Sequence, residues 1–431
     1  MADVKREMPQ GPPADGAEIG EARLRETVDA VARRSYGKLV AFLAARTHDV
    51  AAAEDALSEA FASALVDWPK NGCPENPEGW LLTVARRKSV DAMRGQRRGE
   101  IAAGHLRVMA EGLEAAAASA EIPDQRLALL FACAHPAIDV AVRAPLMLQT
   151  VLGLDAAAIA SAFLVAPATM GQRLVRAKNK IRQAGIPFAV PQREELRERV
   201  DTVLDAIYAA FAEGWSDGAG TDAARRDLAS EAIFLCRVVV ELMPEEAEAR
   251  GLLALMLHAE ARSGARCNER GEYVPLAEQD TAKWDTKMMR EAEDQLLRAS
   301  ALGRLGRFQL EAALQSAHVF RRMSGEENWA DVVQLYDALL GICASPVVAI
   351  NRAVAVGELR GASAGLEALR EVETDARVTE YQPYWAARAD LLAKAGEREE
   401  ARASYEMAIG LERDAAVRRF LQERHERLKL P

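Results

Sequence analysis

Cysteine is scarce in this chain, and its scarcity argues against a disulfide-bonded scaffold. The five cysteines among 431 residues are Cys73, Cys133, Cys236, Cys267 and Cys343. Their number is odd, their spacings are long and no C-x-x-C pair occurs, which fits a reducing cytosol. Cys133 and His135 are close in sequence, but two ligands without a second pair nearby do not make a tetrahedral zinc centre. We therefore expect no metal and no cofactor.

Long apolar runs are absent as well. No stretch approaches the ~18 residues that are needed to span a membrane. The N-terminal sequence MADVKREMPQGPPADG has no apolar core of a secretion signal. Because residues 1–24 are rich in proline, glycine and charge, they have little to bury and are predicted to be a disordered tail. These absences favour a cytoplasmic protein that makes no membrane contact.

The common motifs of catalysis are missing too. No G-x-x-x-x-G-K-[ST] sequence occurs, so ATP hydrolysis is not supported. No ordering of serine, histidine and aspartate suggests a hydrolase. We therefore expect a protein that is not an enzyme.

Alternation of Val, Ile, Thr and Tyr is almost absent, whereas Ala, Leu, Arg and Glu dominate the chain. This composition predicts an all-α protein. Hydrophobic residues make up 50% and charged residues 28%, which is ordinary for a globular protein. The length suggests two or three domains.

The chain is acidic overall, but two of its segments are strongly basic. The formal net charge is −10. The segment 80–98 nevertheless carries six basic residues against one acid, Asp91, and the segment 167–183 carries five basic residues and no acid. Two cationic helices in an acidic chain indicate two contacts with a polyanion, and hence with nucleic acid.

The second basic segment has the layout of a helix-turn-helix. Asp155 can cap a first helix, residues 164–166 form a short turn and Pro167 opens a second helix. One stripe of the second helix is apolar and is expected to be buried: Met170, Leu174, Ala177 and Ile181. Another stripe suits a major-groove reader: Thr169, Arg173, Arg176 and Lys180. The alternative is a solvated basic face on an ordinary helix.

The first basic segment follows a turn-rich break, which the sequence places at residues 68–74. Asn76 and Pro77 then predict a capped helix start. Arg87, Arg94 and Arg98 share a face by helical spacing. Trp68 and Trp80 flank the break, and aromatic rings beside cations suit unstacked bases. The alternative is that both tryptophans are core anchors of a small helical domain.

The C-terminal half is helical but acidic, and part of it looks repetitive. Residues 389–409 resemble one tetratricopeptide helix pair, in which small Ala401 and Ala408 allow close packing and Tyr405 fills the space between. Residues 329–357 have related spacing in a degenerate form. These segments predict a helical-repeat domain.

Two motif sets resemble extracytoplasmic-function sigma factors. DVAAAEDALSEAF (49–61) and NPEGWLLTVARR (76–87) resemble their region 2. Residues 124–183 resemble their region 4, with ATMGQRLVRA (168–177) in the place of the recognition helix. The C-terminal half, with FAEGWSDG at 211–218, resembles the subgroup whose sigma core is fused to a tetratricopeptide-like domain.

The resemblance implies a division of the all-α chain into successive parts. These are region 2 (25–100), a linker (101–122), region 4 (123–187) and a C-terminal regulatory domain (193–431). It also implies residues in three roles. Core RNA polymerase would be bound at Glu54, Asp55 and Glu59. The −10 promoter element would be contacted at Asn76, Trp80, Arg87, Arg94 and Arg98. The −35 element would be contacted at Thr169, Gln172, Arg173, Arg176 and Lys180.

The resemblance therefore implies a sigma factor that binds core RNA polymerase and directs it to promoter DNA. The linker would thread near the polymerase active site, and the C-terminal domain would regulate activity through a protein partner or a signal. Ser58 departs from the family pattern, because many members carry glutamine there. The alternative is a repressor or activator whose helical-repeat half binds a partner.

Overall fold

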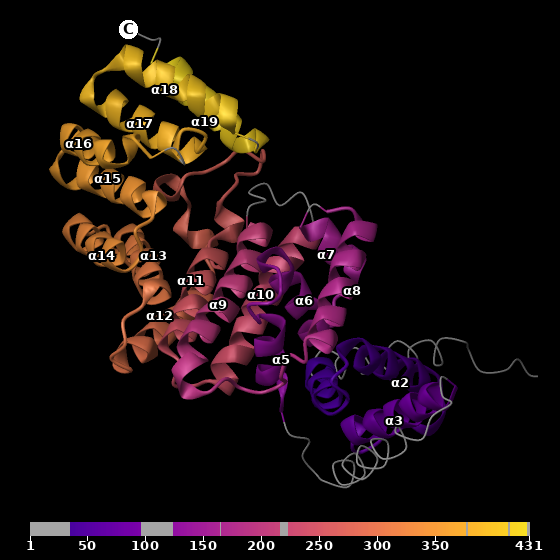
Figure 1. The fold of residues 1–431 in the computed structure, drawn as a ribbon. Helices are drawn as coiled ribbons and strands as arrows, with labels where there is room; N and C mark the ends of the chain where they lie inside the picture. The colour runs from indigo at the N-terminus through magenta and orange to yellow at the C-terminus, as the bar shows by residue number, and fades with distance from the viewer. Residues whose placement is uncertain are drawn as a thin grey trace, which may run out of the picture. The chain divides into compact units, whose positions relative to one another are not determined.

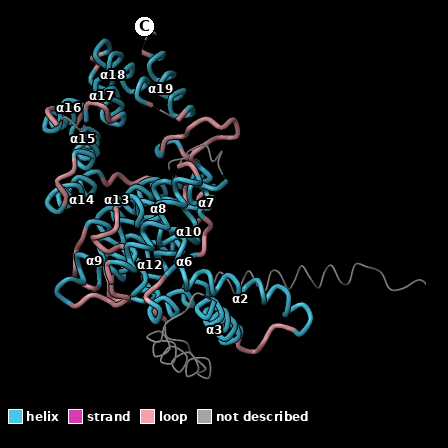
Figure 2. Tube along the Cα trace, turned by 45° about the vertical axis from the view of Figure 1, so that its right-hand side comes forward, coloured by secondary structure: helices cyan, strands magenta, loops and turns pink. Residues whose placement is uncertain are grey.

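The computed structural model describes residues 35–95, 124–163, 165–215, 223–375, 378–412 and 414–428. In this part the chain is all-α, as predicted. Helices are joined by loops, and none of the described residues forms an extended strand (Figure 2). The predicted tail (1–24) and the predicted linker (101–122) lie outside the described residues.

The chain divides into two compact units. The first contains the described residues of Met1–Ala160 and Ala166–Arg199, and the second contains those of Ser161–Val165 and Val200–Pro431. Helix α9 (Arg193–Trp215) begins in the first unit and continues into the second.

The first unit holds two groups of helices. The first group is a helix over residues 35–47, α2 (Val50–Asn71) and α3 (Pro77–Gly95). The second group is α5 (Arg126–Cys133), α6 (Val140–Leu152), α7 (Ala156–Ala162), whose last two residues belong to the second unit, and α8 (Pro167–Gln183). Large apolar side chains are fully buried in both groups, among them Phe42, Leu57, Trp68, Phe131 and Met147.

Local signals place the helix starts of this unit. The Asn76 side chain caps α3, because its Oδ1 accepts a hydrogen bond from the Gly79 N–H at 2.9 Å. Asp155 caps α7 in the same way, accepting from the Ala157 and Ala158 N–H groups at 2.8 Å. Each cap satisfies amide groups that have no partner inside the helix. Both caps were predicted from the sequence.

The predicted break at residues 68–74 was placed too early. Helix α2 continues through Pro69 to Asn71, and the chain turns at Gly72, whose φ is 84°. Proline is tolerated here because only the last turn of the helix follows it, and the Gly72 N–H still donates to the Trp68 carbonyl at 2.9 Å. The break is therefore a short loop at residues 72–76.

The second unit is a succession of helices. After α9 come α10 (Ala223–Leu242), α11 (Ala247–Glu260), α12 (Thr286–Ala301), α13 (Arg307–Ser324), α14 (Trp329–Ile342), α15 (Pro346–Arg360), α16 (Ala362–Glu373), α17 (Gln382–Ala395), α18 (Arg398–Leu411) and α19 (Ala415–Arg427). From α13 onward each helix packs against the next one along the chain (Figure 1). Between α11 and α12 runs a longer connection with three short 3-10 turns.

Small residues allow two of these helix pairs to pack closely. Helices α15 and α16 cross where Gly357 and Gly365 face each other, and a Cβ on Gly365 would lie 2.8 Å from the Gly357 α-carbon. Residues 389–409 form parts of α17 and α18, and Ala401, Tyr405 and Ala408 are buried between helices. The packing positions expected from the sequence of this pair are therefore the buried ones.

Candidate nucleic-acid interface

Helix α8 separates an apolar face from a cationic one. Its four buried residues are Met170, Leu174, Ala177 and Ile181, which is the stripe that the sequence predicts. The five residues predicted to contact the −35 element are all exposed: Thr169, Gln172, Arg173, Arg176 and Lys180. The helix contains no acidic residue, so its exposed basic side chains have no counter-charge within the helix itself.

Three of these side chains line a cleft in the first unit. Arg173, Arg176 and Lys180 lie on one side of a cavity of about 460 Å³, and residues 137–139, 141 and 142 form the other side. The second wall includes the first turn of α6, where the Asp139 carboxylate accepts a hydrogen bond from the Ala141 N–H at 2.9 Å. The three cationic side chains suit a phosphate, whereas the Asp139 carboxylate already caps the N-terminus of α6 and adds a negative charge to the opposite wall. The sequence did not indicate this second wall, because it lies about 30 residues before α8 in the chain.

The residues predicted to contact the −10 element are only partly described. Asn76 and Arg87 are exposed, and Trp80 is half-buried. Arg94 belongs to α3, but its side chain lies outside the described residues, as does all of Arg98. The side-chain carbonyl oxygen of Asn76 accepts the hydrogen bond that caps α3.

The two tryptophans form one aromatic pair at the loop between α2 and α3. Their ring centroids are 5.6 Å apart, at an interplanar angle of 65°. Trp68 is 1% exposed and anchors the core, whereas Trp80 keeps part of its surface accessible. The core alternative therefore applies to Trp68, and Trp80 remains a candidate platform for an unstacked base.

The three acids predicted to bind polymerase have different environments. Asp55 and Glu59 are exposed and lie one helical turn apart on α2. Glu54 is 8% exposed, and its Oε2 accepts a hydrogen bond from the Lys178 Nζ at 2.6 Å. Burial raises the pKa of Glu54 above its usual value, and the nearby Lys178 ammonium opposes that rise. The structure therefore brings two of the acids together on the surface and sets the third apart.

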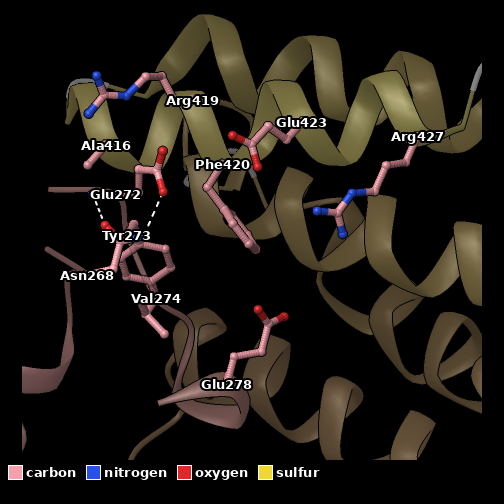
Figure 3. A pocket seen from close by; sticks show the side chains of 10 residues that line it. All are labelled: Asn268, Glu272, Tyr273, Val274, Glu278, Ala416, Arg419, Phe420, Glu423 and Arg427. Atoms are coloured by element: carbon pink, nitrogen blue, oxygen red, sulfur yellow. Dashed lines mark hydrogen bonds between the residues drawn. The ribbon is translucent and has the colours of Figure 1, made fainter. Parts of the chain in front are cut away.

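A smaller cleft lies in the second unit, and no sequence pattern predicted it. The connection after α11 and the helix α19 enclose about 170 Å³ (Figure 3). The rings of Tyr273 and Phe420 meet edge to face at its centre, 5.5 Å apart. Charged side chains surround them: Glu272, Glu278, Arg419, Glu423 and Arg427. The two walls are joined by an ion pair between Arg424 and Glu278 at 2.9 Å.

The described residues contain neither a candidate metal-binding cluster nor a helix that could span a membrane. In the ranges given above, no cluster of three or more histidine, cysteine, aspartate or glutamate residues could hold a metal ion. No helix in the described part of the chain has both the length and the apolarity to cross a membrane. Of the segment FAEGWSDG (211–218), residues 216–218 lie outside the described residues.

Comparison with known protein families matches two segments of the chain. Residues 31–99 match the family Sigma-70 region 2, and residues 199–300 match a family of unknown function, DUF6596. No solved structure matches the chain. The chain thus carries a sigma-70 region 2, a domain that supports binding of core RNA polymerase and DNA, followed by a DUF6596 domain.

One relative is similar to the chain over most of its length. The "Uncharacterized protein R00370" of Rhizobium meliloti (strain 1021) is 35% identical over 376 residues, which is 86% of this chain and 88% of that protein. The chain belongs to the same family as this rhizobial protein.

Proposed function

We propose that this protein is a sigma factor of the extracytoplasmic-function type, which binds core RNA polymerase in the cytoplasm and directs it to promoters. The observation that carries the proposal is the joint presence of a sigma-70 region 2 at residues 31–99 and of the exposed, acid-free cationic face of α8. Such a factor positions and melts DNA but performs no chemistry, so no catalytic residue is required.

In this proposal α7 and α8 are a helix-turn-helix that reads the −35 element. Gln172, Arg173 and Arg176 would contact base edges, because amide and guanidinium groups can bond adenine and guanine in pairs. Thr169 and Lys180 would hold phosphates on either side. The cationic side chains that line the cleft between α8 and the first turn of α6 would hold a phosphate of the DNA backbone.

Region 2 would contact the −10 element. Trp80 lies at the loop that separates α2 from α3, and Arg87 is exposed two turns further along α3. The Trp80 ring could stack on a base that has left the DNA helix, and the Arg87 guanidinium could bind the phosphate beside it. These contacts would offset the free energy that unstacking the base costs. Asn76, Arg94 and Arg98 complete the proposed −10 contact.

The acidic surface of α2 would dock on core polymerase. Asp55 and Glu59 present two carboxylates at a spacing of one turn, and these fit a basic surface on the partner. Glu54 is the third proposed contact, although it is buried beside Lys178 in the structure. A single charged surface next to the −10 contact would place the polymerase and the DNA on neighbouring faces of region 2.

The C-terminal helices would form a tetratricopeptide-like regulatory domain. The close crossing of α15 with α16 and the buried small residues of α17 and α18 support a repeat of helix pairs. Helical repeats present extended surfaces to protein partners. We propose that a partner or a signal acts on transcription through this domain.

In-vitro transcription from a genomic promoter library tests the proposal. Purified core polymerase would be supplied with and without the protein, and the transcripts would be sequenced. We expect new transcripts whose upstream regions share two sequence blocks. An absence of new transcripts, together with tight binding to duplex DNA without polymerase, would favour the repressor or activator alternative.

A further inference from the structure

One of the proposed polymerase contacts is occupied within the chain itself. Glu54 and Lys178 are separated by 124 residues in sequence, yet the Lys178 Nζ lies 2.6 Å from the Glu54 Oε2. Lys178 also donates to the Gln149 Oε1 at 2.9 Å. The side chains of Glu54 and Lys178 are 10% and 12% exposed. A partner protein could not reach this carboxylate without first separating α2 from α8.

A second ion pair joins the same two helices. The Arg182 Nη1 lies 3.0 Å from the Asp49 Oδ2 at the edge of the contact. Arg182 follows Lys178 by one turn of α8, and Asp49 is the residue that caps α2. Two charges on α8 therefore meet two charges at the start of α2, and the signs are complementary.

Close backbone packing lies next to these ion pairs. A Cβ on Gly37 would collide with the carbonyl oxygen of Val151 in α6. The ring of Tyr36 covers Gly153, where a Cβ would lie 3.0 Å from the ring. Helix 35–47 and α2 thus form one side of a continuous contact, and α6 and α8 form the other.

The composition of this contact suggests that it serves more than stability. Two charges that leave water lose hydration energy, and their attraction often does no more than balance that loss. The Glu54 Oε1 has no hydrogen-bond partner among the described residues, so the carboxylate is only half satisfied. An ion pair of this kind adds little to the stability of the contact, but it determines which charged group can sit beside Glu54.

We propose that the contact between α2 and α8 is a latch that keeps Glu54 from core polymerase until the chain opens. The inference rests on the proposed function, in which Glu54 belongs to the polymerase-docking surface. On opening, a basic group of the polymerase replaces Lys178 beside Glu54, and α8 is released to reach DNA. The measured affinity for polymerase is then the intrinsic affinity multiplied by the open fraction.

Removing the charge of Lys178 tests whether this ion pair keeps the contact closed. In Lys178→Ala, Glu54 is left buried without a counter-charge, so the closed state is disfavoured. We expect the affinity of full-length protein for core polymerase to rise, by about tenfold if one molecule in ten is open in the wild type. Lys70→Ala is the matched control, because it removes the same charge from an exposed site on α2. Equal affinities of wild type and Lys178→Ala would overturn the proposal.

Charge reversal at the second ion pair checks the same contact without changing Glu54. Arg182→Asp should open the contact by placing two carboxylates together, and should therefore raise the affinity for polymerase. Adding Asp49→Arg restores opposite charges and should close the contact again, which lowers the affinity for polymerase below that of Arg182→Asp alone. An affinity of the double variant that equals or exceeds that of Arg182→Asp would overturn the proposal.

A reversible crosslink tests the closed state without relying on affinity gains. Asp49→Cys and Arg182→Cys would be introduced after the three cysteines that are not buried, Cys73, Cys267 and Cys343, are changed to serine. A short bis-methanethiosulfonate should join the two new thiols in the free protein. We expect the joined protein not to bind core polymerase, and expect binding to return after reduction.

The outcomes separate the latch from the function on which it rests. Absence of the crosslink, or undiminished polymerase binding by the joined protein, would overturn the latch alone. If the reduced protein and the wild type both fail to bind polymerase, the proposed function is overturned, and the latch with it.

Discussion

At the scale of single residues, the two arginines of α8 are where specificity would arise. Arg173 and Arg176 are exposed, and both line the cleft beside α6. If they contact base edges, Arg173→Ala and Arg176→Ala should each weaken −35 recognition by about 1–3 kcal/mol. The measurement is transcription from promoters with intact and altered −35 blocks.

The control for these variants is Arg298→Ala, which removes an exposed arginine from α12 in the other unit. It should leave promoter choice unchanged. Unaltered promoter selectivity in both α8 variants would remove these arginines from the site.

Asn76 has a structural role that can be separated from a role in DNA binding. Its side chain caps α3, and loss of such a cap costs about 0.5–2 kcal/mol. We expect Asn76→Ala to lower the free energy of unfolding by that amount, and Asn76→Ser to retain most of it because serine also caps helices. Urea denaturation measures both. If Asn76→Ser is stable but transcribes poorly, the amide nitrogen has a further role in binding a base.

His318 should make the second unit sensitive to acid. Burial, followed by the nearby Arg321 and Arg262 charges, lowers its pKa from 6.5 to about 4. Between pH 6.5 and 4, His318 binds a proton in the unfolded chain but stays neutral in the folded chain. The free energy of unfolding is therefore highest above pH 6.5 and decreases as the pH falls towards 4. We expect wild-type stability to fall more steeply than that of His318→Gln over this range, as measured by denaturation at several pH values. Parallel curves would contradict the prediction.

At the scale of elements, the crossing of α15 and α16 depends on glycine. A Cβ at Gly365 would lie 2.8 Å from the Gly357 α-carbon and 2.9 Å from the Ala353 carbonyl oxygen, and neither backbone atom can move freely. Gly365→Ala should therefore destabilise the second unit by about 1–3 kcal/mol, as overpacking does. Thermal unfolding shows whether the substitution lowers the stability of the protein.

Gly410 in α18 offers a matched comparison. It is also helical, but a Cβ there would meet nothing within 4 Å. Gly410→Ala should stabilise the protein by up to about 1 kcal/mol, because alanine loses less backbone entropy in a helix. Equal effects of the two substitutions would show that packing at the crossing is not the cause.

Individual elements were predictable from sequence because their signals are local. The α8 stripe follows from a 3.6-residue period, and the starts of α3 and α7 follow from capping side chains. The end of α2 was misjudged, since Pro69 is a strong local breaker that the last turn of a helix can tolerate. The ion pair of Glu54 with Lys178 was beyond such reasoning, because no period or cap links residues 124 positions apart.

At the scale of the whole molecule, the two units differ in the functions proposed for them. The proposed promoter-reading residues all lie in the first unit, and the DUF6596 match at residues 199–300 lies in or at the edge of the second. The fully buried core of the first unit includes Phe42, Leu57, Phe131 and Met147. The first unit thus buries an apolar core of its own, so we expect it to fold when residues 193–431 are deleted, although the deletion also removes its residues 193–199 and the hydrogen bond that Arg199 donates to the Phe131 carbonyl.

The deletion of residues 193–431 consequently tests regulation. We expect the shortened chain to remain helical and to bind promoter DNA together with core polymerase, because the residues proposed for both contacts are retained. Its transcription should differ from that of the full chain, since the proposed regulatory domain is gone. Circular dichroism confirms folding, and in-vitro transcription at equal concentrations measures the effect. A folded deletion variant that transcribes as the full chain does would contradict a regulatory role for the C-terminal helices and would leave promoter recognition to the first unit alone.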